Sequence, residues 1–207
     1  MPMADTKQKI LNASLQLFNE NGISNVRLQQ IADETGISVG NLAYHYNNKE
    51  AIAESLITNV IESLQELLRQ YGKYPSLTDL DFFFKEYYKL WAQYSFFNYD
   101  ILEIKRNFPS SYDSLLPLFN KVKLQLERRF DLLSQQKLLQ KEANIKNIAA
   151  NTWLFMFFMP EEGQLNGKNV ISENNYRRRL WDYVLLYLTA KGINEYSASV
   201  EPEFTGK

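Results

Sequence analysis

Hydrophobic residues recur every three or four positions along nearly the whole chain, which is the spacing of an amphipathic helix. Between residues 7 and 22 they form two adjacent rows, Ile10, Ala13 and Leu17 in one and Leu11, Leu15 and Phe18 in the other. Asn21 and Gly22 then supply a helix stop, because glycine takes the left-handed conformation that ends helices. No segment alternates convincingly in the manner of a strand. The pattern therefore predicts an all-α protein.

The next helices follow from the same spacing. A short helix over about 28–35 ends at Gly36, and a third begins after Ser38, a natural N-cap. Asn47 and Asn48 interrupt the pattern, and either can cap a long fourth helix that ends near residue 71. Within the short third helix, Val39, Leu42 and Tyr46 are spaced to face inward.

We expect five further helices, at roughly 77–97, 99–108, 113–138, 144–159 and 173–191. Pro109, Pro160 and Gly192 mark the breaks between or after them. Residues 160–172 are predicted to form a loop, and residues 194–207 a frayed acidic tail.

Two short helices joined by a tight glycine turn indicate a helix-turn-helix motif. Gly36 suits the turn because a sharp reversal needs a positive φ there. Gly40 lies in the first turn of the second short helix, where a missing side chain lets the backbone approach DNA or its own neighbour closely. The Asn41 amide can pair with adenine in a major groove. Phosphate contacts are expected from Tyr44, His45 and, with the amides at the start of the fourth helix, Lys49.

Each of these residues also has a structural interpretation. The two glycines are compatible with a helix-turn-helix used only for packing. His45 can be a solvated or capping residue, Lys49 a solvated charge, and Asn41 a residue engaged in helix capping.

The motif closely resembles the N-terminal DNA-binding region of the TetR family of bacterial regulators. The resemblance covers "ILNASLQLFNENGISNVRLQQIA" and "TGISVGNLAYHYNNKEAI", about the first quarter of the chain. Its matching features are Ile31, Ala32, Gly36, Ser38, Gly40, Leu42, His45, Tyr46, Lys49 and Glu50. The resemblance implies a DNA-contacting set of Arg27, Ser38, Val39, Gly40, Asn41, Tyr44, His45 and Lys49.

Three positions depart from the family pattern. Ala43 stands where the family often has tyrosine, and we expect Tyr44 to take over its phosphate contact. Val39 replaces a residue that is commonly polar or basic. Arg27 stands where threonine or serine usually opens the second helix, which leaves Asn25 as a candidate cap and offers a charged phosphate contact instead.

Charge and composition limit the other possibilities. The 207-residue chain has a formal net charge of -1, and its first 50 residues carry four bases against five acids, so we expect only a modest salt dependence of DNA binding. The chain has no cysteine, which excludes disulfides, thiolate metal sites and cysteine nucleophiles and fits a cytoplasmic location. Its most apolar run, residues 153–159, is too short to span a membrane. We predict no metal, cofactor or membrane association.

The second part of the chain is rich in aromatic residues, which either fill a core or line a cavity for a small apolar or amphipathic effector. The candidate pocket residues are Trp91, Tyr94, Trp153 and Phe157. The last two long helices are apolar over more than one face, so they are buried within one subunit or form a four-helix interface between two. The candidate interface residues are Ile148, Thr152, Phe155, Met156, Trp181, Val184 and Leu188.

The sequence thus predicts a helix-turn-helix domain over residues 1–50 that continues through a long helix into an all-helical domain over residues 51–207. By family resemblance, the second domain binds an effector and forms a homodimer, and the dimer binds a pseudo-palindromic operator in double-stranded DNA, most often as a repressor. An enzyme is disfavoured because no nucleophile, metal cluster or phosphate loop is present. The remaining alternative is a helical protein-interaction or small-molecule-binding protein whose helix-turn-helix does not bind DNA.

Overall fold

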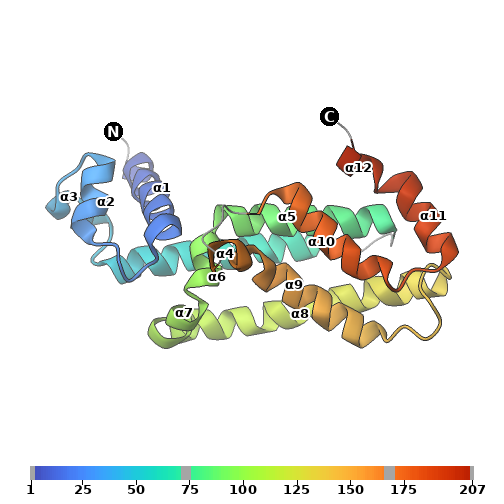
Figure 1. Ribbon diagram of the computed structural model, residues 1–207. Coiled ribbons are helices and arrows are strands. Elements are labelled where there is room, and N and C mark those ends of the chain that lie inside the picture. The colour runs from blue at the N-terminus through green and yellow to red at the C-terminus, as the bar shows by residue number, and fades with distance from the viewer. Residues whose placement is uncertain (1–2, 71–75, 166–170, 206–207) are drawn as a thin grey trace. The chain divides into compact units, whose positions relative to one another are not determined.

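A computed structural model describes residues 3–70, 76–165 and 171–205, and every regular element in these ranges is a helix (Figure 1). The first four are α1 (Met3–Asn21), α2 (Leu28–Thr35), α3 (Val39–His45) and α4 (Lys49–Gln70). They are followed by α5 (Leu77–Gln93), α6 (Ser95–Tyr99), α7 (Ile101–Asn107) and α8 (Pro109–Gln135). The last are α9 (Ile145–Leu165), α10 (Glu173–Leu185), α11 (Ala190–Ser199) and α12 (Pro202–Thr205). The all-α prediction is confirmed.

The chain packs into two compact units, which are described separately. The first unit comprises residues 1–63 and 91–116, and the second comprises residues 64–90 and 117–207. Packing thus adds α6, α7 and their neighbours to the N-terminal helices. The predicted domain boundary after residue 50 stays a prediction.

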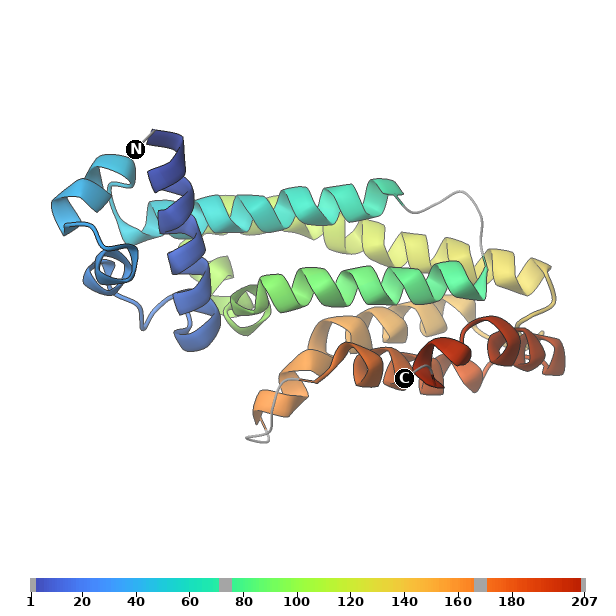
Figure 2. The same ribbon diagram turned by 90° about the horizontal axis from the view of Figure 1, so that it is seen from above.

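The first unit is built on α1, which contacts both α2 and α6; Figure 2 shows α1 and α2 from above. Its core contains the apolar rows that the sequence predicts, with Ile10, Phe18, Ile31 and Leu42 fully buried. The ring centroid of Phe18 lies 6.0 Å from that of Phe96 on α6. Burying such side chains contributes roughly 1.5–3 kcal/mol each, so this small cluster fixes α1 against α6.

The second unit contains α9 and α10, which pack against each other. The Trp181 ring of α10 meets Phe84 of α5 edge to face at 5.8 Å and lies 4.9 Å from Tyr196 of α11. Beneath these rings, the buried Asp81 carboxylate accepts hydrogen bonds from the Arg177 guanidinium and from the Trp181 indole N–H. Two buried side chains, Arg177 and Trp181, therefore donate hydrogen bonds to the same buried carboxylate.

Two predicted helix boundaries are wrong. The predicted helix 77–97 is divided at Tyr94, and α9 continues through Pro160 to residue 165, where a loop is predicted. Pro160 is buried, so tertiary packing outweighs the backbone hydrogen bond that proline removes. The rest of that predicted loop includes residues 166–170, which lie outside the described residues.

The predicted frayed tail is also wrong, because the chain continues as α11 and α12. Tyr196 of α11, Val200 at the end of α11 and Phe204 of α12 are all buried. Gly192 does not follow a helix but lies inside α11. A Cβ atom at this position would lie 2.4 Å from the Leu138 carbonyl oxygen, so only glycine allows this close approach.

In the described part of the chain, no helix is both long enough and apolar enough to cross a membrane.

Candidate DNA-binding surface

The turn between α2 and α3 has the geometry that the sequence predicts. Gly36 ends α2 in the left-handed conformation, with φ 67° and ψ 30°. The backbone N–H of Ile37 then bonds the Ala32 carbonyl at 3.0 Å. Ser38 caps α3, because its Oγ accepts a hydrogen bond from the Asn41 backbone N–H at 3.1 Å. The helix-turn-helix geometry is therefore confirmed, and it rests on one positive φ and one side-chain cap.

The inner face of α3 holds the helix in place. Leu42 is fully buried, Tyr46 is buried and Val39 is half-buried, as their spacing predicts. Burial raises the pKa of the Tyr46 phenol above its ordinary value. Val39 is thus partly covered by its own chain, and its expected DNA contact stays a prediction.

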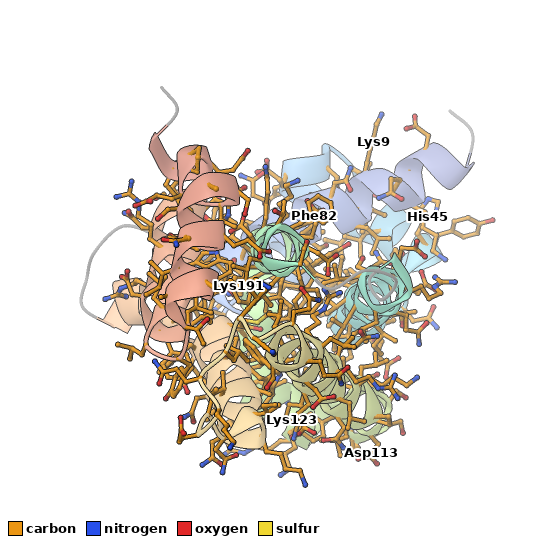
Figure 3. All side chains as sticks on the ribbon, turned by 90° about the vertical axis from the view of Figure 1, so that its right-hand side faces the viewer. Lys9, His45, Phe82, Asp113, Lys123 and Lys191 are labelled. Atoms are coloured by element: carbon orange, nitrogen blue, oxygen red, sulfur yellow. The ribbon has the colours of Figure 1, made fainter. Side chains whose placement is uncertain are left out.

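The outer face of α3 carries polar groups into solvent. Asn41 is exposed, and 72% of the Tyr44 surface is accessible. The Tyr44 and His45 rings meet edge to face at 5.4 Å, and Figure 3 shows His45 in this region of the N-terminal helices. At Gly40 a Cβ atom would meet only the Ser38 Oγ, at 3.9 Å. Close packing against the described residues therefore does not explain this glycine.

Lys49 has partners that the sequence does not reveal. Its ammonium group donates hydrogen bonds to the Ile23 carbonyl at 2.7 Å and to the Ser24 carbonyl at 3.2 Å. The start of α4 is capped separately by Asn48, whose Oδ1 accepts from the Ala51 N–H at 2.8 Å. Because two of its three donors are used within the chain, Lys49 holds the α1–α2 turn, and its expected phosphate contact stays a prediction.

Two acidic residues also form hydrogen bonds with this turn. The Asp100 carboxylate accepts the Ile23 backbone N–H at 2.7 Å, and Glu103 on α7 accepts the Ser24 hydroxyl. Burial raises the pKa of Asp100 above its ordinary value, although the Ile23 hydrogen bond lowers it. The sequence analysis missed both acids, because partners 77 and 79 positions apart leave no local pattern.

Arg27 is the N-cap residue of α2, and its side chain is exposed. Its backbone N–H donates to the Gln30 Oε1 at 2.8 Å, so Gln30 rather than Asn25 satisfies the helix start. The Asn25 amide instead donates to the Asn21 carbonyl at the end of α1, and the expected Asn25 cap is wrong. Two further cations lie on α1: Lys7 is stacked on the Tyr46 ring at 5.1 Å, and Lys9 extends away from the helix (Figure 3).

Comparison with known proteins agrees with this geometry. Residues 10–56 match the model of a family described as bacterial regulatory proteins, tetR family. The N-terminal region belongs to the tetR family. It is 36% identical over 56 residues to the HTH-type transcriptional regulator RutR of Escherichia coli K12, a match that covers 27% of this chain and 26% of RutR.

Other relatives match the tetR-family region to a similar extent. The probable HTH-type transcriptional regulator YttP of Bacillus subtilis is 29% identical over 63 residues, covering 30% of each chain. The matched segment thus spans less than a third of the length of these curated relatives. The fold similarity extends further: a TetR-family transcriptional regulator from Marinobacter aquaeolei VT8 superposes with a TM-score of 0.80 over 96% of this chain and 97% of that one, at 22% identity.

Outside the tetR-family region, the four candidate effector residues fall into two pairs. Trp91 and Tyr94 are buried in the first unit. Trp153 and Phe157 lie in the second, where their ring centroids are 5.8 Å apart and both contact Phe119. Their joint role in one cavity stays a prediction.

The predicted interface residues require a correction. Ile148, Thr152, Met156, Trp181, Val184 and Leu188 are at most 2% exposed in the single chain. These six residues therefore belong to the core of the single chain. Phe155 alone of the seven is exposed, at 41%. The large exposed apolar residues of this region are Leu154, Phe155 and Phe158 of α9 and Leu186, the residue that follows α10.

Proposed function

We propose that the chain is a ligand-responsive transcription regulator that binds a pseudo-palindromic operator as a homodimer and is released from it by a small effector. The observation that carries the proposal is the capped α3 helix, which turns its apolar side inward and presents Asn41 and Tyr44 to solvent. A helix held in this way fits the major groove of B-form DNA. The tetR-family match of residues 10–56 supports the same assignment.

Each exposed residue receives a distinct role in the proposal. The Asn41 amide reads a base edge, because asparagine pairs bidentately with adenine. Tyr44 contributes its phenol to a phosphate, and Arg27 adds a charged phosphate contact at the start of α2. Lys49 holds the α1–α2 turn.

DNA binding is tested by a band-shift assay with DNA from upstream of the protein's own gene. Asn41→Ala should change the preference at particular base pairs, whereas Arg27→Ala should weaken all sequences alike and reduce the salt slope by about one. Asn194→Ala, which removes an exposed asparagine of α11, is the matched control and should change neither. The absence of any specific, salt-sensitive complex would overturn the proposal in favour of a helix-turn-helix that binds protein.

The homodimer is assigned to the apolar surface of α9 and α10 formed by Leu154, Phe155, Phe158 and Leu186. The Phe155 ring meets Tyr183 of α10 edge to face at 5.0 Å, which joins the exposed side of α9 to α10. Apolar faces of this kind are typical of protein interfaces.

The dimer is tested by analytical ultracentrifugation. Phe158→Glu should shift the sedimentation coefficient to that of a monomer, because it places a charge in the buried centre of the interface. Ile193→Glu, at a residue of α11 with similar exposure, should leave the dimer intact. A monomeric wild-type protein, or equal effects of both variants, would contradict this assignment.

A further inference from the structure

A groove of about 500 Å³ lies between the C-terminal end of α4 and the middle of α8. Its lining residues are Gln65, Leu68, Arg69, Leu118, Lys121, Leu124, Gln125 and Arg128, all of which belong to the second unit. The two walls are joined by a hydrogen bond of 3.4 Å from the Gln125 amide to the Leu68 carbonyl. The volume is within the range of small-molecule pockets, roughly 300–1,000 Å³.

The base of the groove is apolar. Leu68 and Leu118 are buried, and Leu124 stands at the rim with 51% of its surface accessible. About half of the Leu124 side chain is in contact with water. An alkyl group lying on it would remove this apolar surface from water without displacing other side chains. The leucines therefore favour a ligand with an aliphatic part.

The rim of the groove is positively charged. It carries Arg69, Lys121 and Arg128, and none of the lining residues is acidic. Arg69 pairs with Glu66 on its own helix. In the part of the chain that the structure describes, neither Lys121 nor Arg128 forms an ion pair. Cations gathered above a wall of low polarity strengthen the local field and attract an anion.

We propose that this groove binds a soluble amphipathic carboxylate of the medium-chain fatty acid type. The carboxylate is held by Arg128 and Lys121, since guanidinium and ammonium groups form charge-assisted hydrogen bonds with carboxylates. The alkyl chain lies on Leu68, Leu118 and Leu124. Identifying this ligand as the effector rests on the proposed function, but binding to the groove does not.

The proposal is tested by calorimetric titration of the full-length protein without DNA. Decanoate, 1-decanol and decyltrimethylammonium are compared below their aggregation concentrations, so that only the head group differs. We expect saturable binding of decanoate, weaker binding of the alcohol and none of the cation, with the decanoate affinity falling as salt rises.

Variants at the rim separate the groove from the rest of the surface. Lys121→Gln and Arg128→Gln should each weaken decanoate binding by about 3- to 5-fold, the effect of losing one exposed ion pair. Leu124→Gln should weaken the acid and the alcohol equally. Lys146→Gln removes an exposed lysine of α9 and should have no effect. Circular dichroism of each variant confirms that it remains folded, as expected for exposed positions.

Three results would overturn the groove assignment: equal affinities for the acid and the alcohol, rim variants that bind like the wild type, or binding only to phosphatidylglycerol vesicles, which would indicate a membrane surface. Decanoate binding together with failure of the band-shift assay would overturn the proposed function and leave the groove intact. Operator binding without decanoate binding would overturn the groove assignment and leave the proposed function intact.

Discussion

The same substitution, glycine to alanine, should have opposite effects at two helical positions. In Gly192→Ala the new Cβ atom would lie 2.4 Å from the Leu138 carbonyl oxygen and 3.1 Å from the Leu188 Cβ. An ordinary close contact between carbon and oxygen is about 3.3 Å, so α11 and the connector after α8 must separate by about 0.9 Å. This connector cannot yield freely, because Thr189 and Lys191 hydrogen-bond its carbonyl groups.

The net effect follows from two opposing contributions. Overpacking a site of this kind costs about 1–3 kcal/mol, and the rigid backbone neighbour places Gly192→Ala at the upper end. Alanine gains about 1 kcal/mol in helix propensity. We therefore expect a loss of about 2 kcal/mol in the free energy of unfolding, which corresponds to a fall of about 4–8 °C in the melting temperature of a chain of this size.

Gly40→Ala is the matched control, because its Cβ atom would meet only the Ser38 Oγ at 3.9 Å. It should raise the free energy of unfolding by up to about 1 kcal/mol. Urea denaturation followed by circular dichroism measures both values. A Gly192→Ala protein as stable as the wild type would refute the close-approach explanation, and a destabilised Gly40→Ala protein would show that the space around α3 has been misjudged.

Three further substitutions test the polar contacts. Lys49→Met should lower the free energy of unfolding by about 1–2 kcal/mol, because two carbonyl groups of the α1–α2 turn lose their donor; unchanged urea denaturation would contradict the positioning role. Burial raises the pKa of Asp100 above 3.8, so the native state binds its proton more tightly and this group's contribution to stability falls as pH rises from about 4 through the raised pKa. Asp100→Asn keeps an acceptor for the Ile23 amide and should lose this decline, which urea titrations at several pH values will detect. Asp81→Ala leaves the buried Arg177 with only its 3.3 Å ion pair to the half-buried Glu173 and should cost about 3–5 kcal/mol, much of it regained in Asp81→Leu with Arg177→Met. Equal denaturation curves for Asp81→Ala and wild type would rule out a buried charge that depends on Asp81.

Local chemistry made part of this structure predictable. A glycine with positive φ and a serine N-cap act through neighbours within four residues, so the sequence predicts Gly36 and Ser38 correctly. It limits the cap of the fourth helix to Asn47 or Asn48, and the structure uses Asn48. The bounds of α2 agree with the prediction for the same reason. The inward face of α3 follows from spacing alone, since Leu42 and Tyr46 are four residues apart.

Contacts between distant segments made the rest unpredictable. Lys49 donates hydrogen bonds to carbonyl groups 26 and 25 residues earlier in the chain. The residues at the start of α4 give no indication of these partners. The apolar faces of α9 and α10 predict that these helices are buried, but they do not identify the segments that cover them. Trp181 is covered by Phe84 and Tyr196 of the same chain. The hydrophobic pattern alone is also compatible with burial against a partner subunit.

In the C-terminal helices, the hydrophobic spacing and the helix-breaking residues favour different structures. Tyr196, Val200 and Phe204 have helical spacing, but Gly192 and Pro202 lie beside them and favour a break. The structure uses Pro202 to begin α12 and Gly192 to bring α11 close to its neighbour. Residues that interrupt helices in isolation are therefore compatible with helix formation where packing requires them.

The contact of Phe204 with the buried ion pair has a consequence for how long the protein survives. The Phe204 ring lies 4.7 Å from the Arg177 guanidinium, and its carbonyl accepts a hydrogen bond from Arg178. Local opening of α12 would lift this ring away and let water reach the guanidinium that it covers. Opening of one short helix would thus weaken a core that lies far from it in sequence, and it would leave the molecule more exposed to proteolysis.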